Sequence, residues 1–113
     1  MRKQIFPALL IAFVAFGSAQ APQSNQAESG AILFRDNCAR CHGSNREGTK
    51  KGPVLAGIGK KKHWTDEKIT NRILNGEGKM PSFRDSLSSE QIQQLVTFLR
   101  AENHPPAPPA PQQ

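Results

Sequence analysis

Apolar residues recur at helical spacing in three segments of the chain, and the first segment predicts a helix that starts near Ala27. Gly30 and Phe34 lie four residues apart and therefore share one face of this helix. Glycine inside a helix costs about 1 kcal/mol relative to alanine, so we expect another helix to approach closely at Gly30. Leu95 and Phe98, three residues apart near the end of the chain, are the predicted partners in that crossing.

The second segment predicts a helix between Thr65 and Asn75. Thr65 suits the N-cap, and Asp66 and Glu67 place negative charge in the first turn, where it meets the positive end of the helix dipole. Gly76 follows as a predicted left-handed cap. The buried stripe of this helix is predicted to consist of Ile69, Ile73 and Leu74.

The last segment carries the clearest local signals. Ser88 is the predicted N-cap, and Gln91, three residues later, completes a capping box. Leu87 and Ile92 flank this start as a hydrophobic staple. The helix that follows has apolar residues at the spacing of one buried face, namely Ile92, Leu95, Val96 and Leu99.

Residues 1–19 have the pattern of a secretory signal peptide. Two basic residues precede an apolar run over residues 5–16, and small residues follow up to Ala19. The run is shorter than the roughly 20 residues that a membrane-spanning helix needs. We expect cleavage after Ala19, with cleavage after Ala21 or retention as an uncleaved anchor as the alternatives.

Cleavage after Ala19 leaves 94 of the 113 residues. They are expected to form a flexible segment at 20–26, one domain at 27–102 and a disordered proline-rich tail at 103–113. After export the chain is predicted to be a periplasmic monomer without a membrane-spanning helix.

Both cysteines of the chain belong to the pentapeptide Cys38-Ala39-Arg40-Cys41-His42. This spacing is the attachment signature of c-type haem. On a helix the two thiols lie about one turn apart on one face, so both can bond to one edge of a porphyrin. His42 follows about 100° further round the helix, where its imidazole can bind the iron from the same side.

Three other functions of the cysteine pair compete with haem attachment. A thioredoxin-type dithiol needs a βαβ context, but residues 31–34 before Cys38 indicate helix. A zinc site formed by both cysteines and His63 would also need His42, and Cys41 and His42 are adjacent, which makes a shared tetrahedron difficult. A disulfide that closes so short a loop would be labile.

The second candidate ligand is Met80, the only methionine that remains after removal of the predicted signal peptide. Segment 76–83 contains two glycines, and Pro81 disfavours helical torsions at Met80, so this loop can present a thioether sulfur. Core filling is the commoner use of a methionine. His63 and His104 are the alternative sixth ligands.

Taken together, these features resemble a small bacterial class I cytochrome c. The resemblance covers residues 27–102 and includes the pentapeptide, Gly52-Pro53-Val54-Leu55, Trp64, Met80-Pro81-Ser82-Phe83 and the helix after Ser88. It implies an all-α cytochrome c fold, in which three to four short helices wrap around one covalent haem and the N- and C-terminal helices cross. It also implies that the iron lies between His42 and Met80.

The resemblance implies roles for three further residues. The carbonyl of Pro53 would accept the other ring N–H of His42, and Leu55 would pack on the proximal face of the haem. Trp64 would lie near the haem propionates, although a half-buried packing role is equally consistent with its position. The chain has no tyrosine, so a phenol hydrogen bond to Met80 is replaced, if at all, by Asn71 or Asn75.

This coordination favours electron transfer, because no position on the iron is left for oxygen or substrate. We expect a one-electron carrier between respiratory or dehydrogenase partners, not an enzyme. A haem-based redox or gas sensor, a peroxidase-like enzyme and an electron-accepting subunit of a larger oxidoreductase complex are the alternatives.

The chain is basic, with a formal net charge of +6. A lysine cluster between the haem motif and the second helix would steer an acidic redox partner, or would simply be a solvated loop. A nucleic-acid partner is not expected, because interleaved aromatic residues are missing. The core of so small a domain is thin, so we expect the apoprotein to be largely unfolded. The cluster consists of Lys50, Lys51, Lys60, Lys61 and Lys62.

Overall fold

The computed structural model describes residues 23–101 and, outside them, only residues 17, 109 and 112. Within this part the chain forms α-helices and one 3₁₀ helix, and its only β-type pairing is an isolated bridge between Glu77 and Met80. The predicted all-α fold is confirmed. Apart from residues 17, 109 and 112, the predicted signal peptide and proline-rich tail lie outside the described residues. The helices are α1 (Gln23–Asn37), α2 (Ala39–His42), η1 (Ile58–Lys60), α3 (Asp66–Asn75) and α4 (Ser89–Arg100).

Helix α1 begins four residues earlier than predicted, at Gln23 instead of Ala27. The expectation of a flexible segment up to residue 26 was therefore wrong for residues 23–26. These residues include neither glycine nor proline, and glutamine is a good helix former. Their polarity was not a stop signal, because a helix can extend beyond the part that has a buried face.

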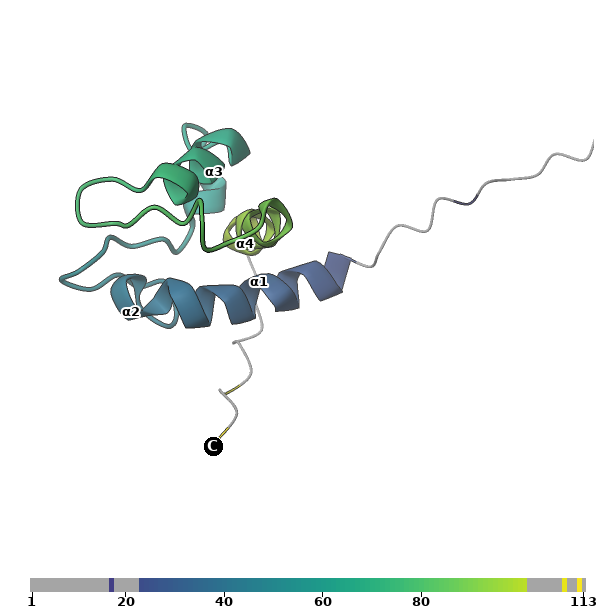
Figure 1. The fold of residues 1–113 in the computed structure, drawn as a ribbon, viewed down its shortest axis with the longest axis horizontal. Helices are drawn as coiled ribbons and strands as arrows, with labels where there is room; N and C mark the ends of the chain where they lie inside the picture. Colours follow the sequence, from purple (N-terminus) through teal and green to yellow (C-terminus); the bar gives the residue numbers. More distant parts are fainter. Residues whose placement is uncertain (1–16, 18–22, 102–108, 110–111, 113) are drawn as a thin grey trace, which may run out of the picture.

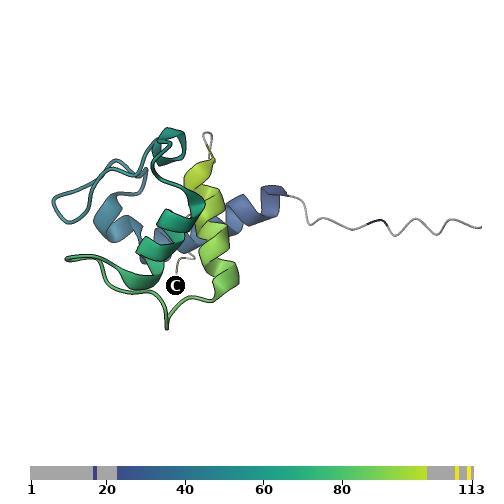
Figure 2. The same cartoon turned by 90° about the horizontal axis from the view of Figure 1, so that it is seen from above.

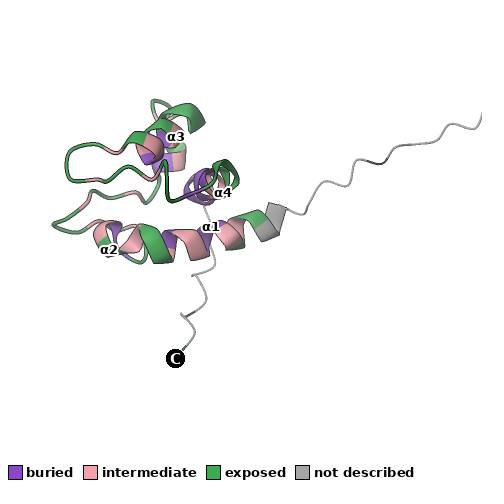
Figure 3. Cartoon of the chain, in the orientation of Figure 1, coloured by how far each residue is buried: buried purple, intermediate pink, exposed green. Residues whose placement is uncertain are grey.

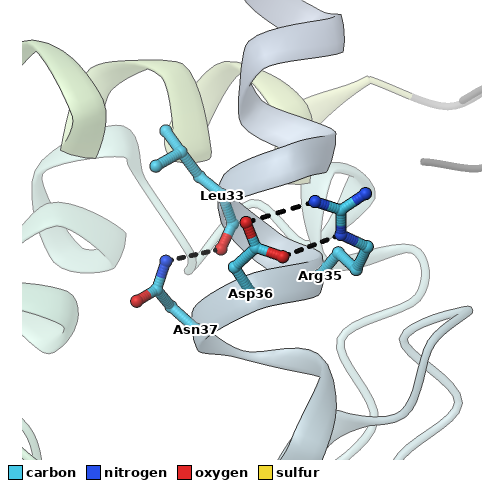
Figure 4. A network of polar contacts seen from close by, with 4 residues as sticks. All are labelled: Leu33, Arg35, Asp36 and Asn37. Atoms are coloured by element: carbon cyan, nitrogen blue, oxygen red, sulfur yellow. Dashed lines mark hydrogen bonds and ion pairs between the residues drawn. The ribbon is translucent and has the colours of Figure 1, made fainter. Parts of the chain in front are cut away.

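The last turn of α1 leads directly into the cysteine motif. The side chain of Asn37 donates to Leu33 O at 2.9 Å, and Arg35 pairs with the neighbouring Asp36 at 2.7 Å (Figure 4). Cys38 N still donates to Phe34 O at 2.8 Å, as in a continuing helix. Only Cys38 separates α1 from α2, so the end of α1 fixes where the motif starts.

Helices α1 and α4 cross, as predicted. Figure 1 shows α4 almost end-on above α1, and Figure 2 shows the two helices crossing. The rings of Phe34 and Phe98 lie 5.3 Å apart at the crossing. A Cβ atom placed on Gly30 would collide with Gln94 O and lie 2.6 Å from the Phe98 Cβ. The missing side chain at Gly30 therefore permits the close approach, and its nearest neighbours on α4 are the backbone of Gln94 and the Cβ of the predicted partner Phe98.

Helix α3 starts at the predicted cap, because the Thr65 hydroxyl accepts from Lys68 N at 3.2 Å. Ile69 and Ile73 are buried, but Leu74 is only half-buried. Leu74 lies about 100° round the helix from Ile73, so it lies off the face that Ile69 and Ile73 share. Gly76 has the expected positive φ of 67°, but its ψ of −176° is extended, so the prediction of a left-handed cap was wrong. The chain leaves α3 in an extended direction.

The predicted capping box of α4 is present in full. Gln91 N donates to the Ser88 hydroxyl at 3.2 Å, and Ser88 N donates to the Gln91 side chain at 2.9 Å. Leu87 and Ile92 on either side are both buried. The buried faces of α1, α3 and α4 turn towards one another (Figure 3). With Ile58 of η1 and Leu87 of the segment before α4, they form a core of Ala31, Phe34, Ile58, Ile69, Ile73, Leu87, Ile92, Leu95, Val96, Phe98 and Leu99.

Two long loops complete the domain. Residues 43–57 connect α2 to η1, and residues 76–88 connect α3 to α4. Parts of both loops project to the same side of the molecule, away from the crossing of α1 and α4 (Figures 1 and 2). The first loop carries Pro53 and Leu55, and the second carries Met80. Among the described residues no helix has the length and apolar character required to cross a membrane.

Candidate functional site

The cysteine motif occupies a single helical turn. Cys38 is the N-cap of α2, and His42 N donates to Cys38 O at 3.0 Å across that turn. Cys38 and Cys41 are both free and half-buried, and His42 is 8% exposed. The motif is therefore helical, and both cysteines and His42 belong to the same turn.

The imidazole of His42 is held by the loop that follows it. Its Nδ1 atom lies 2.9 Å from Pro53 O, as predicted. A carbonyl oxygen can only accept, so Nδ1 carries the proton. In the neutral ring this leaves a lone pair on Nε2, the atom that would bind a metal. The hydrogen bond thus selects the tautomer that an axial ligand requires.

Close backbone approach places Pro53 beside His42. A Cβ atom on Gly52 would lie 2.9 Å from Cys41 O and 3.1 Å from the His42 Nδ1, so a side chain there would disturb the pair. The Thr49 hydroxyl donates to Cys41 O at 2.6 Å and ties the loop to α2 from the other side. Gly52 and Thr49 therefore set the position of the Pro53 carbonyl.

A residue that the sequence interpretation missed, Arg46, fastens the same loop to the core. Its backbone oxygen accepts from Leu55 N at 2.9 Å and from Ala56 N at 3.0 Å. Its guanidinium lies over the Phe98 ring, 5.3 Å from the ring centroid. Arg46 has a φ of 62°, a backbone angle that residues other than glycine rarely adopt, and no local sequence pattern signals it. Leu55, predicted to pack on the haem, is half-buried and contacts the core.

The structure disfavours the competing functions of the cysteine pair. Burial raises the pKa of the Cys38 thiol to about 12, and the neighbouring Cys41 adds to the rise. A thioredoxin-type site depends on a lowered thiol pKa, so Cys38 has the opposite property. Among the described residues, histidine, cysteine and carboxylate side chains form no group of three that would hold a metal ion. His63, an alternative sixth ligand, is exposed and lies before α3, whereas Met80 lies after α3.

Met80 ends a tight turn. Glu77 N donates to Met80 O at 3.1 Å and Met80 N donates to Glu77 O at 3.0 Å, which closes the turn with two hydrogen bonds. Gly78 within it has a φ of 60°, a backbone conformation that suits glycine. The Met80 side chain is half-buried and contacts the core. Met80 therefore lies in a non-helical turn, as predicted.

Trp64 is linked to this turn by two residues that the sequence interpretation missed. The Arg72 guanidinium lies 5.2 Å from the centroid of the Trp64 indole ring. Arg72 also pairs with Glu77 at 2.7 Å. Glu77 lies beyond the end of α3, so helical spacing does not reveal the pair. Trp64 and the Met80 turn are therefore connected through one arginine.

The described residues fit a covalent haem. The available donors are two thiols, an imidazole with Nε2 left to bind a metal, and a thioether, which is the donor set of haem c. Several apolar side chains contact the core yet remain half-buried, so the domain has an apolar surface that a flat cofactor would cover. They come from α1, the cysteine motif, α3, both loops and the segment between η1 and α3, and they are Leu33, Cys38, Ala39, Leu55, Trp64, Leu74, Met80 and Phe83.

Comparison with known proteins agrees with this donor set. The family described as "Cytochrome C oxidase, cbb3-type, subunit III" matches residues 25–99. The chain is similar to cytochrome c6 of Nostoc sp. (strain PCC 7120), with 32% identity over 86% of this chain and 91% of the relative. It is also similar to cytochrome c6 of Leptolyngbya boryana, with 37% identity over 65% of this chain and 88% of the relative.

Solved structures give the same result. The crystal structure of cytochrome c6C from Synechococcus sp. PCC 7002 is similar with a TM-score of 0.54 and 31% identity. The match covers 64% of this chain and 90% of that structure. The chain thus belongs to the family described as "Cytochrome C oxidase, cbb3-type, subunit III", which matches residues 25–99. It is a small class I monohaem c-type cytochrome, which is an electron-transfer protein and not an enzyme.

Proposed function

We propose that this chain is an exported one-electron carrier that holds one haem c through Cys38 and Cys41, with His42 and Met80 as the two axial ligands. The observation that carries the proposal is the hydrogen bond from His42 Nδ1 to Pro53 O at 2.9 Å. It orients the imidazole and leaves Nε2 for the iron, an arrangement typical of histidines that ligate metals.

The protein's own residues determine what the site can do. When bound, haem c supplies a one-electron couple through its iron. Met80 contributes a neutral thioether, which favours the reduced iron and raises the reduction potential. With His42 and Met80 both holding the iron, no position on it would be left for oxygen or substrate. The half-buried apolar side chains would cover the apolar faces of the cofactor. These properties support electron transfer without chemistry on a bound substrate.

The proposed location is the periplasm, on the strength of the signal-peptide pattern in residues 1–19. The proposed partner is an acidic redox protein that docks near the loop carrying Pro53. Lys50 and Lys51 are exposed in that loop, and they would attract such a partner. Lys60, Lys61 and Lys62 are also exposed, at the end of η1 and directly after it, and they would add to this positive charge.

Absorption spectra of the exported, haem-loaded protein test this proposal. The ferric wild type is expected to show low-spin lines and a far-red band from the Met80 sulfur to the iron, and the ferrous form to bind carbon monoxide slowly. Met80→Ala should lose the band and bind carbon monoxide fast. His63→Ala is the matched control and should keep the wild-type spectrum. High-spin ferric wild type with fast ligand uptake would instead favour a sensor or a peroxidase-like enzyme.

The family description favours one second candidate, an electron-accepting subunit of a larger complex, because it names a subunit of an oxidase. Size-exclusion chromatography of gently prepared host extract separates the two. A carrier elutes at the size of a single chain, and a subunit elutes with a haem-containing assembly many times larger.

A further inference from the structure

The segment after Met80 returns to the last turn of α3. The final carbonyl groups of a helix have no partner within the helix and must be satisfied from outside. Here they and the last side chain of α3 receive hydrogen bonds from three consecutive residues. These bonds run from Phe83 N to Ile73 O at 3.0 Å, from Ser82 Oγ to Leu74 O at 2.6 Å, and from Arg84 Nη2 to Asn75 Oδ1 at 2.6 Å.

We call Ser82 and Arg84, with their hydrogen bonds to α3, the clip. The hydroxyl of Ser82 is its centre. Ser82 Oγ donates to Leu74 O and accepts from Arg84 N at 3.3 Å, so it connects the helix end with the returning backbone. The clip closes the intervening residues 76–81 into a short loop, and the Met80 turn is the tip of that loop. A closed loop has fewer conformations than an open one, so the clip restricts Met80.

Other contacts restrain the turn as well. The ion pair between Arg72 and Glu77 also connects α3 to the turn, but their side chains are 38% and 67% exposed. Pairs as exposed as this contribute little, because solvent and salt screen them. Lys79 within the turn is exposed. The clip adds two short hydrogen bonds to this ion pair, and one of them is made to a backbone carbonyl of α3.

We infer that Ser82 and Arg84 are positioning residues, which fasten the Met80 turn to α3 and thereby set how often Met80 leaves the iron. This inference rests on the proposed function, because it assumes that Met80 is the axial ligand. Both side chains are exposed and lie outside the core, so their substitution removes the clip without creating a cavity.

Two measurements on the holoprotein test the inference. Amide hydrogen exchange at Glu77 and Met80 reports opening of the turn itself, since each amide donates to the other's carbonyl. The apparent dissociation constant of imidazole for the ferric protein reports how readily Met80 is displaced. Loss of one net hydrogen bond of about 1 kcal/mol corresponds to about a fivefold change in an opening equilibrium.

Ser82→Ala and Arg84→Leu should each exchange these amides about fivefold faster and bind imidazole about fivefold more tightly. Ser82→Thr keeps the hydroxyl and should behave as the wild type. Ser89→Ala is the matched control, because Ser89 is an exposed serine in the first turn of α4, away from the clip. It should change neither measurement.

Wild-type exchange and wild-type imidazole affinity in Ser82→Ala and Arg84→Leu would overturn the inference. Faster exchange with unchanged imidazole affinity would overturn it as well, because the clip would then hold the turn without affecting Met80 as a ligand. A wild type without the far-red band refutes the proposed ligation by Met80, and the exchange rates still show separately whether the clip holds the turn.

Discussion

The crossing of α1 and α4 gives the most demanding test of the fold, and Gly30→Ala is the perturbation. The new Cβ would collide with Gln94 O and lie 2.6 Å from the Phe98 Cβ. The carbonyl belongs to the backbone of α4 and the Cβ cannot rotate away, so the two helices must separate. Overpacking of this kind costs about 1–3 kcal/mol.

Helix propensity acts in the opposite direction. Replacing glycine by alanine inside α1 favours the helix by about 1 kcal/mol. Because both obstructing atoms are rigid, we place the steric cost at the upper end of its range, which leaves a net destabilisation of about 1–2 kcal/mol. For a domain of this size that lowers the melting temperature by about 5–15 °C.

Thermal unfolding of the holoprotein, followed by far-ultraviolet circular dichroism, measures this shift. Ser29→Ala is the control, since it raises helix propensity at the neighbouring position of α1 without placing a new atom against α4. It should melt at or slightly above the wild-type temperature. If Gly30→Ala melted as high as Ser29→Ala, the close approach at Gly30 would be refuted.

Three further predictions follow from the site. Gly52→Ala should weaken the hydrogen bond from His42 to Pro53 and raise the reduction potential by about 50 mV, roughly a tenfold change in a one-electron equilibrium. An unchanged potential in a voltammetric titration would contradict this prediction. The apoprotein should be largely unfolded, so equal helix content with and without haem by circular dichroism would be the opposite result. Lys50→Glu combined with Lys51→Glu should slow reduction by an acidic partner about tenfold at low salt and little at high salt. Stopped-flow reduction rates that do not change with ionic strength would exclude electrostatic steering.

The parts of the fold that local chemistry determines could be predicted from the sequence. The caps at Thr65 and Ser88 depend on residues three positions apart, and both form as expected. The crossing at Gly30 was also predictable, because a glycine in an otherwise good helix needs a tertiary reason. The early start of α1 was missed, since residues 23–26 carry no apolar pattern.

The contacts that hold the site were harder to predict. The Pro53 carbonyl was predicted through the family resemblance, not through spacing. The bond from Ser82 to Leu74 joins residues eight apart, and it depends on the path of the chain between them. Arg46 reaches Phe98 across the domain, and its positive φ has no local signature. Such contacts depend on tertiary structure, so periodicity and capping rules do not reveal them.

Intact-mass spectrometry shows whether Cys38 and Cys41 hold a haem covalently. The exported protein should be purified, unfolded in acid and weighed, beside a Cys38→Ala, Cys41→Ala variant prepared in the same way. We expect a wild-type mass equal to the processed polypeptide plus one haem, and a variant mass without this addition. A wild-type mass equal to the bare polypeptide would contradict it.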